Sequence, residues 1–222
     1  MTFVRWGLPT LGWTLLLTGW AVWVAPAGPA RWAVLAVCAL LLGFVINFFR
    51  NPRRVPQGGE ECLVSAADGV VADVQEVDEL AFLGGRALRI GVFMNVFDVH
   101  VNRASVSATV AWVRYRPGRF LDVRHPDASH ANEALDLGLE LDDGTKLLLR
   151  QISGWIARRI VCTHGVGDRL QRGEVFGMIK FGSRVELWIP VGRAVPVVQV
   201  GQRVKAGETV IARLSAGAPA AR

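Results

Sequence analysis

The sequence predicts a mainly β domain of antiparallel sheets, preceded by a two-helix membrane hairpin. Two uncharged apolar runs before residue 50 indicate the hairpin, and short β-branched segments separated by turn signals indicate the sheets. The 222 residues suffice for one globular domain and a small second unit. Hydrophobic residues make up 51% of the chain, and their excess is concentrated before residue 50.

The two apolar runs span residues 8–24 and 32–49, and neither contains a charged side chain. Each is near the lower limit of roughly 17 to 25 residues for a membrane-spanning helix. Residues 25–31, APAGPAR, form a Pro/Gly turn between them. A cleaved signal peptide is the alternative interpretation. It fits poorly, because a second apolar run follows and no small-residue cleavage site is evident.

Basic residues give the expected orientation of the hairpin. Arg5 precedes the first run, Arg50, Arg53 and Arg54 follow the second, and only Arg31 lies between them. The positive-inside rule therefore places the C-terminal domain at the cytoplasmic face of the cell membrane. The net charge of +6 favours anionic lipid surfaces. Nucleic acid is not expected as a partner, because the chain shows no recognition-helix or aromatic-basic pattern.

We expect residues 1–50 to form the membrane hairpin and residues 51–222 to form the cytoplasmic domain. Residues 50–61, with two prolines, two glycines and mixed charge, are typical of a linker that leaves the membrane. The stretch DDG at 142–144, between two alternating apolar segments, predicts a β-hairpin. Residues 151–161 leave room for one or two helical turns.

A weak internal repeat begins at Val166 and again at Val200, with the shared pattern V-G-x-R-(V/L)-x-x-G-E. This order of turn glycine, polar turn, second glycine and strand resembles the hairpins of lipoyl- and biotinyl-type barrel-sandwich domains. Those carriers present a lysine at an exposed hairpin tip. Lys180 is instead expected on a strand that runs into Gly182, so the repeat indicates the fold and not a carried cofactor.

His100 is the histidine with the most informative neighbours. In FMNVFDVHVNR, Asp98 and Asn102 lie at period-two spacing from it, as on one face of an extended segment. Imidazole is the usual side chain for moving protons near neutral pH. His125 and His130 lie in a polar loop and are interpreted as solvated.

Neither a disulfide nor a metal site is predicted. Cys38, Cys62 and Cys162 are far apart and odd in number, which favours inert thiols in a reducing compartment. The chain lacks H-x-x-x-H, C-x-x-C and paired-carboxylate metal spacings.

Asp68 and the Gly182-Ser183 pair each allow a structural and a chemical interpretation. An aspartate before a glycine, as at Asp68, is typical of a turn. In MIKFGSRVELWIP, the Gly-Ser pair divides two apolar segments, as a hairpin turn does. No G-x-S-x-G elbow or S-x-x-K spacing surrounds Ser183, which argues against a hydrolase or peptidase serine. The local pattern leaves both interpretations open.

Taken together, these segments resemble the short form of phosphatidylserine decarboxylase, a membrane-associated, pyruvoyl-dependent family. The resemblance covers most of the chain. It rests on FFRNPRR, SAADGVV, FMNVFDVHVNR, QISGWIARRIVC, GDRLQRGEVFGMIKFGSRVELWIP and VGQRVKAGETVIA. The long phrases around His100 and Gly182-Ser183 make it specific. The resemblance implies decarboxylation of phosphatidylserine in the membrane to phosphatidylethanolamine and CO2, a step of phospholipid biosynthesis.

The resemblance also implies a proenzyme that cuts itself between Gly182 and Ser183. The Ser183 hydroxyl attacks the Gly182 carbonyl, the amide becomes an ester, and elimination and hydrolysis leave a covalent pyruvoyl group and ammonia. The products are a β chain, 1–182, and an α chain, 183–222, which stay together as a heterodimer. Glycine permits a strained backbone at the attacked carbonyl, and serine needs an adjacent base.

The family resemblance assigns the base to His100, oriented by Asp68. The pyruvoyl carbonyl is expected to form a Schiff base with the substrate amine and to accept electrons as CO2 leaves. His100 is then the candidate for reprotonating the substrate carbon. Longer relatives carry a second histidine in a D-x-H-x-x-H phrase, where this chain has Arg103. His100 therefore does both tasks or shares them. Asn102 and Arg103 are expected to hold the substrate phosphate or carboxylate.

Other functions stay open on the sequence alone. A membrane-tethered adaptor built on lipoyl-like hairpins, without catalysis, needs no Asp68, His100 or Gly-Ser pair. A decarboxylase of a related archaeal-type serine phospholipid is also compatible, because the sequence says little about the stereochemistry of the head group. A homo-oligomer is likewise compatible with the sequence.

Overall fold

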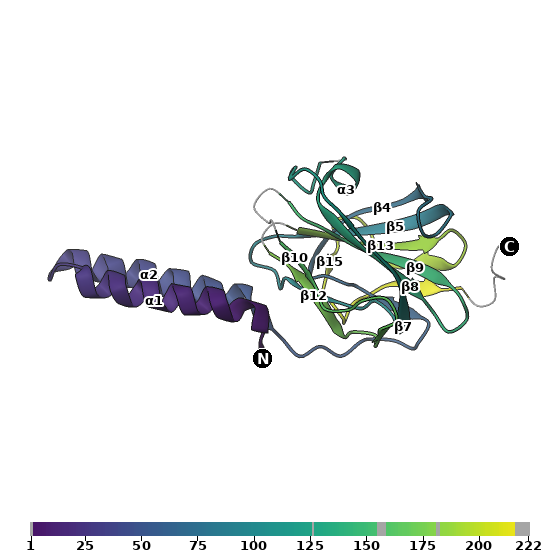
Figure 1. The fold of residues 1–222 in the computed structure, drawn as a ribbon. Helices are drawn as coiled ribbons and strands as arrows, with labels where there is room; N and C mark the ends of the chain where they lie inside the picture. Colours follow the sequence, from purple (N-terminus) through teal and green to yellow (C-terminus); the bar gives the residue numbers. More distant parts are fainter. Residues whose placement is uncertain (1, 126, 155–158, 181–182, 216–222) are drawn as a thin grey trace. The chain divides into compact units, whose positions relative to one another are not determined.

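The computed structural model describes residues 2–125, 127–154, 159–180 and 183–215. The chain forms two compact units, Met1–Arg53 and Arg54–Arg222. The first unit is helical, and the second is built almost entirely of antiparallel strands (Figure 1). The predicted fold class is therefore confirmed.

Two long helices, α1 (Leu8–Val24) and α2 (Pro29–Phe48), lie side by side in the first unit (Figure 1). A 3-10 turn, η1 (Arg5–Gly7), precedes α1. Strand β1 (Thr2–Phe3) pairs with β2 (Arg50–Asn51) and so joins the two ends of the hairpin. Both helices are long and apolar enough to cross a membrane, and few of their residues are buried within the protein.

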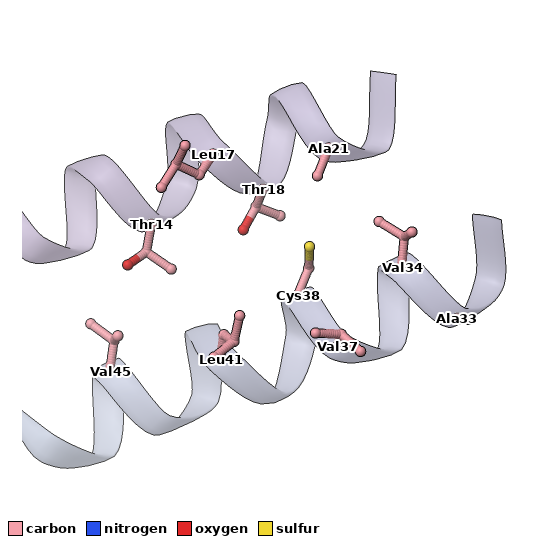
Figure 2. A pocket seen from close by; sticks show the side chains of 10 residues that line it. All are labelled: Thr14, Leu17, Thr18, Ala21, Ala33, Val34, Val37, Cys38, Leu41 and Val45. Atoms are coloured by element: carbon pink, nitrogen blue, oxygen red, sulfur yellow. The ribbon is translucent and has the colours of Figure 1, made fainter. Parts of the chain in front are cut away.

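A cleft of about 540 Å³ lies between these two helices, as Figure 2 shows. Its lining is aliphatic apart from three small polar side chains, Thr14, Thr18 and Cys38. Among the residues that the structure describes, no charged side chain lines this cleft. The described lining therefore offers no charged group for catalysis or for binding an ion.

The second unit contains one eight-stranded sheet and two three-stranded sheets. The large sheet has the order β11-β7-β8-β9-β13-β5-β4-β15, and the small sheets have the orders β10-β12-β6 and β14-β16-β3. The elements are β3 Cys62–Val64, β4 Gly69–Glu79, β5 Gly85–Met94, β6 Val101–Arg103, β7 Ala108–Arg116, α3 Ala128–Ala131, β8 Ala134–Glu140, β9 Lys146–Ile152, β10 Ile160–Cys162, β11 Arg169–Leu170, β12 Val175–Ile179, β13 Ser183–Pro190, β14 Ala194–Pro196, β15 Arg203–Val204 and β16 Val210–Leu214.

The main hydrophobic core lies between the large sheet and the two small ones. Val185 and Leu187 of β13 belong to it, together with Phe176 of β12 and Ile211 of β16. Alternation along β13 turns Arg184, Glu186 and Trp188 to the other face of the large sheet. The two faces therefore have different chemistry, which decides where each candidate residue points.

The hairpin predicted at residues 142–144 is confirmed. Strands β8 and β9 pair in register from Ala134↔Ile152 to Glu140↔Lys146, and Gly144 has a φ of 79° in the connecting turn. Such a positive φ is a conformation that glycine adopts without steric cost.

The internal repeat corresponds to a repeated structural unit. In each copy a two-residue strand joins the large sheet, and the following strand joins a small sheet. These strands are β11 and β12 in the first copy and β15 and β16 in the second. The turn glycines, Gly173 and Gly207, have φ values of 81° and 68° and lie against each other. The lipoyl-like strand–turn–strand unit thus occurs twice.

The hairpin interpretation of Gly182-Ser183 is wrong. Strand β12 pairs with β10 and β6 in a small sheet, whereas β13 pairs with β5 and β9 in the large sheet. The chain thus crosses between two sheets at this point. Gly182 itself lies outside the described residues, as does most of the helical turn predicted in 151–161.

Candidate active site

Ser183 is the first residue of β13, and its side chain is fully buried. It pairs with Met94, the last residue of β5, and strand alternation turns its side chain to the core face with Val185. Its Oγ has no hydrogen-bond partner among the described residues. A buried polar atom left in this way costs about 1–3 kcal/mol, so Ser183 needs an explanation other than packing.

His100 is also fully buried, and it precedes the short strand β6. The segment before it folds as a turn, in which the Asn95 amide donates to Asp98 Oδ2 at 2.9 Å and the Asp98 amide donates to the Asn95 carbonyl at 3.0 Å. The predicted extended face shared by Asp98, His100 and Asn102 is therefore absent, because Asp98 lies in this turn.

The turn fixes the proton on the His100 ring. Its Nδ1 lies 3.0 Å from the Asp98 carbonyl oxygen. A carbonyl only accepts hydrogen bonds, so Nδ1 carries a proton in this contact, and the neutral ring would have this one proton only. The lone pair is then on Nε2, which is the form needed for a general base.

Asn102, in the strand β6 that follows His100, contacts the strand that pairs with Ser183. Its amide nitrogen lies 3.8 Å from the sulfur of Met94, and its Oδ1 accepts from Gln151 Nε2 at 2.8 Å. Asn102 is fully buried and belongs to β6, while Met94 pairs with Ser183. This network ties β5, β6 and β9 together at the end of β13 where Ser183 begins.

Asp68 lies in a compact charged cluster at the start of β4. Its Oδ1 accepts from the Ala206 amide at 2.7 Å, and its Oδ2 pairs with the Arg54 guanidinium at 2.9 Å. Arg54 also pairs with Glu208 at 3.0 Å. The side chains of Arg54 and Asp68 are only 11% and 12% exposed, so this ion pair is largely shielded from water.

Arg103 lies in the same cluster. Its guanidinium donates to the Gly173 carbonyl at 2.8 Å. Burial and then the neighbouring Arg54 lower the pKa of Arg103, and Asp68 opposes that change. The hydrogen bond from Arg54 lowers the pKa of Glu208. The structure therefore groups Asp68 and Arg103 around Arg54, and it places Asn102 in the buried network described above.

Sequence reasoning missed two contributions to this site. The Asp98 backbone carbonyl acts on His100 through a turn that the alternating pattern did not reveal. Arg54 was interpreted as part of a linker and as a topological signal, whereas it contacts Asp68. Its place in the motif FFRNPRR was the available signal. Within the described residues, no group of three His, Cys, Asp or Glu side chains is arranged to hold a metal.

Comparison with known proteins gives a consistent result. The family model for phosphatidylserine decarboxylase matches residues 41–212. The phosphatidylserine decarboxylase proenzyme of Trichlorobacter lovleyi is 48% identical over 91% of this chain and 90% of its own length. The proenzymes of Symbiobacterium thermophilum and Rhodopirellula baltica are each 44% identical, over 95% and 98% of this chain and 94% and 90% of their own lengths. The chain belongs to the phosphatidylserine decarboxylase family.

Proposed function

We propose that this protein is a self-cleaving proenzyme that decarboxylates phosphatidylserine to phosphatidylethanolamine and CO2. The observation that carries the proposal is the Ser183 hydroxyl, which is buried at the start of β13 and has no hydrogen-bond partner in the described part of the chain. Family membership supports the substrate class, because the relatives are named for it.

Self-cleavage would begin at the Ser183 hydroxyl. As His100 Nε2 takes the hydroxyl proton, Oγ attacks the Gly182 carbonyl, and the C–N bond breaks as an ester forms. Loss of the α proton then expels the Gly182 carboxylate and leaves a dehydroalanine, which water converts to a pyruvoyl group and ammonia. The cut chains, 1–182 and 183–222, stay together in this proposal, because β13 remains paired with β5 and β9.

The residues present fit a pyruvoyl group at position 183. Cleavage would replace the partnerless hydroxyl with a methyl group, and the core face next to Met94 and Val185 suits a methyl group better. The group would supply a carbonyl that conjugates with the substrate amine and accepts the electron pair released as CO2 leaves.

We assign His100 to both proton transfers. The Asp98 carbonyl holds Nδ1–H, so Nε2 can accept the Ser183 proton and later deliver a proton to the substrate carbon. Asp68 would stabilise the protonated imidazole through its negative charge. This assignment leaves the choice of tautomer to Asp98. The contacts of Asn102 and Arg103 with the substrate stay a prediction, since their described partners are protein groups.

The two apolar helices would anchor the enzyme in the cell membrane, with residues 51–222 at the cytoplasmic face. This orientation rests on the arginines that flank the helices. The substrate is itself a membrane lipid, so anchoring would keep the catalytic domain close to it.

Intact-mass analysis of the expressed protein tests the proposal. The wild-type chain should yield the fragment 183–222, lighter by one ammonia than a hydrolysed peptide, and should release CO2 from phosphatidylserine. Ser183→Ala should stay folded and uncut at the full mass of 24.2 kDa, since alanine has no nucleophilic oxygen. A wild-type protein that stays at full mass and is inactive would instead support the adaptor function.

A further inference from the structure

A second cleft, of about 670 Å³, opens on the face of the large sheet opposite the core. Strands β4, β5 and β13 form its floor, and the segment before β8 with the loop before β15 forms its sides. Its lining is Val70, Val71, Ala72, Asp73, Gln75, Val77, Arg89, Phe93, Arg124, His125, His130, Arg184, Val200 and Gly201. It therefore combines an apolar wall of valines with a concentration of cationic side chains.

The floor of this cleft is an ionic network whose charges are already balanced. Asp73 pairs with Arg184 at 2.5 Å and with Arg89 at 3.0 Å, and Arg184 also pairs with Glu186 at 2.7 Å. A side chain at Gly91 would overlap Arg184 and Asp73, so the glycine gives this network its space. Because each arginine of the floor faces a carboxylate, the floor contributes rigidity more than free positive charge.

The sides of the cleft, which form its rim, carry a cationic side chain that a ligand can reach, Arg124. Arg124 lies over the Phe93 ring at 5.8 Å, and its only described ion pair is with Asp122, two residues earlier, with side chains 69% and 51% exposed. The pair is bidentate, but both side chains are largely open to water, so a phosphate can compete with Asp122 for the guanidinium. His130 is the second rim donor. Partial burial and the nearby Arg150 lower the pKa of His130, and its ring can donate an N–H to a ligand.

The cleft begins next to the reactive residue. Arg184 directly follows Ser183, and its strand partner Phe93 directly precedes Met94, the partner of Ser183. Successive residues in a strand are about 3.3 Å apart, so the cleft starts roughly one residue from the α carbon of Ser183. In phosphatidylserine the phosphate is separated from the amine by one short carbon chain. Ser183 and Met94 lie at the ends of their strands, so a lipid can pass around this end of the sheet, with its amine at residue 183 and its phosphate in the cleft.

We propose that this cleft binds the phosphodiester of the phospholipid substrate, with Arg124 and His130 as the donors to the phosphate oxygens. The apolar wall formed by Val70, Val77 and Val200 would receive the glycerol and the first carbons of the acyl chains. The inference rests on the proposed decarboxylase function and names the part of the chain that selects a phospholipid over a free amino acid. An arginine fork is suited to a phosphodiester, because two parallel N–H groups match two phosphate oxygens.

The test uses the full-length, self-cleaved protein in detergent with a short-chain phosphatidylserine. Arg124→Gln should raise KM about tenfold, as expected for the loss of one charge-assisted contact, with kcat and self-cleavage unchanged. Arg124→Lys should restore part of the loss. Arg119→Gln is the matched control, since Arg119 is an exposed arginine of the same loop outside the cleft. It should behave as wild type.

A direct competition arm separates lipid from free phosphate. Short-chain phosphatidylglycerol, which has the phosphodiester but no amine, should compete with the substrate and should lose about tenfold in potency on Arg124→Gln. Inorganic phosphate should be a far weaker competitor. If Arg124→Gln has the same KM as Arg119→Gln, Arg124 does not bind the substrate phosphate and the assignment is wrong. If inorganic phosphate competes as strongly as phosphatidylglycerol, the cleft binds phosphate but does not select a lipid. If the wild-type protein is uncut or inactive, the result contradicts the proposed decarboxylase function itself, and not only the phosphate-binding role of the cleft.

Discussion

The two faces of β13 differ sharply although they belong to one strand of eight residues. On the core face, Ser183 is followed by Val185 and Leu187 in an apolar environment. On the opposite face, Arg184 and Glu186 form a buried ionic network that continues to Asp73. Ser183 and this ionic network are therefore neighbours in sequence that lie on opposite faces of the sheet.

This difference suggests a division of labour. If Ser183 is the proposed cleavage residue, the core face keeps water and competing hydrogen-bond donors away from its hydroxyl. The ionic face fixes the strand and offers the cationic cleft to an anionic ligand. If the division is correct, substitutions on the core face should affect self-cleavage, and substitutions on the ionic face should affect stability or substrate binding.

The largest effect is expected at His100. His100→Ala should slow self-cleavage by about 10²- to 10⁴-fold, the usual contribution of a general base. The measurement is the fraction of cut chain by intact mass against time after expression. His164→Gln is the control and should cleave normally, because His164 lies in the loop after β10 and its Nε2 faces Glu174 at 3.6 Å.

The second task of His100 can be measured separately. If His100→Gln accumulates some cut enzyme, the decarboxylation rate of that fraction should also be low. Normal turnover in that fraction would restrict His100 to self-cleavage and would make another group the proton donor.

Glu186 tests the ionic face. It is fully buried and accepts from Arg184, from Trp188 at 3.0 Å and from Ser129 at 2.8 Å. Glu186→Gln removes the charge and leaves Arg184 short of a counter-ion, which should destabilise the fold by about 3–5 kcal/mol. Chemical denaturation measures this loss. In the folded fraction self-cleavage should proceed at the wild-type rate, and a strong cleavage defect there would contradict the division between the faces.

Much of the fold could be predicted from local sequence signals, but the candidate site could be predicted only in part. The alternating segments, the hairpin at 142–144 and the repeated strand–turn–strand unit each depend on neighbouring residues, so periodicity and turn chemistry were sufficient. The contact between Arg54 and Asp68 depends on how the chain returns in space, and no local pattern records it. The hairpin interpretation at Gly182-Ser183 was wrong for the same reason. A hairpin and a crossing between two sheets have the same local sequence pattern.

Arg54 should have a smaller effect than His100 or Glu186. Arg54→Gln leaves the Asp68 carboxylate without its cation in a site that is mostly shielded, so we expect about a tenfold slower self-cleavage. Arg54→Lys should recover part of the rate, which a purely steric role would not predict. Glu208→Gln is the control, because it removes the other partner of Arg54 and keeps the pair with Asp68. Equal rates for Arg54→Gln and Glu208→Gln would show that the contact with Asp68 is unimportant.

The smallest effect is expected at Arg203, which tests how firmly the Asp98 turn must be held. Its guanidinium pairs with Asp98 Oδ1 at 2.6 Å, while the backbone carbonyl of Asp98 accepts from His100 Nδ1. The Arg203 side chain is 66% exposed, so the pair is screened by water and salt, and the turn keeps its own hydrogen bond from the Asn95 amide. We therefore expect Arg203→Gln to slow self-cleavage by no more than about fivefold, which corresponds to the roughly 1 kcal/mol upper range of an exposed pair.

The defect should shrink at high salt, where the wild-type pair is also screened, and Arg213→Gln, another exposed arginine, should show neither effect. A defect that is large and independent of salt would mean that Arg203 acts on the reacting groups directly and not through the turn.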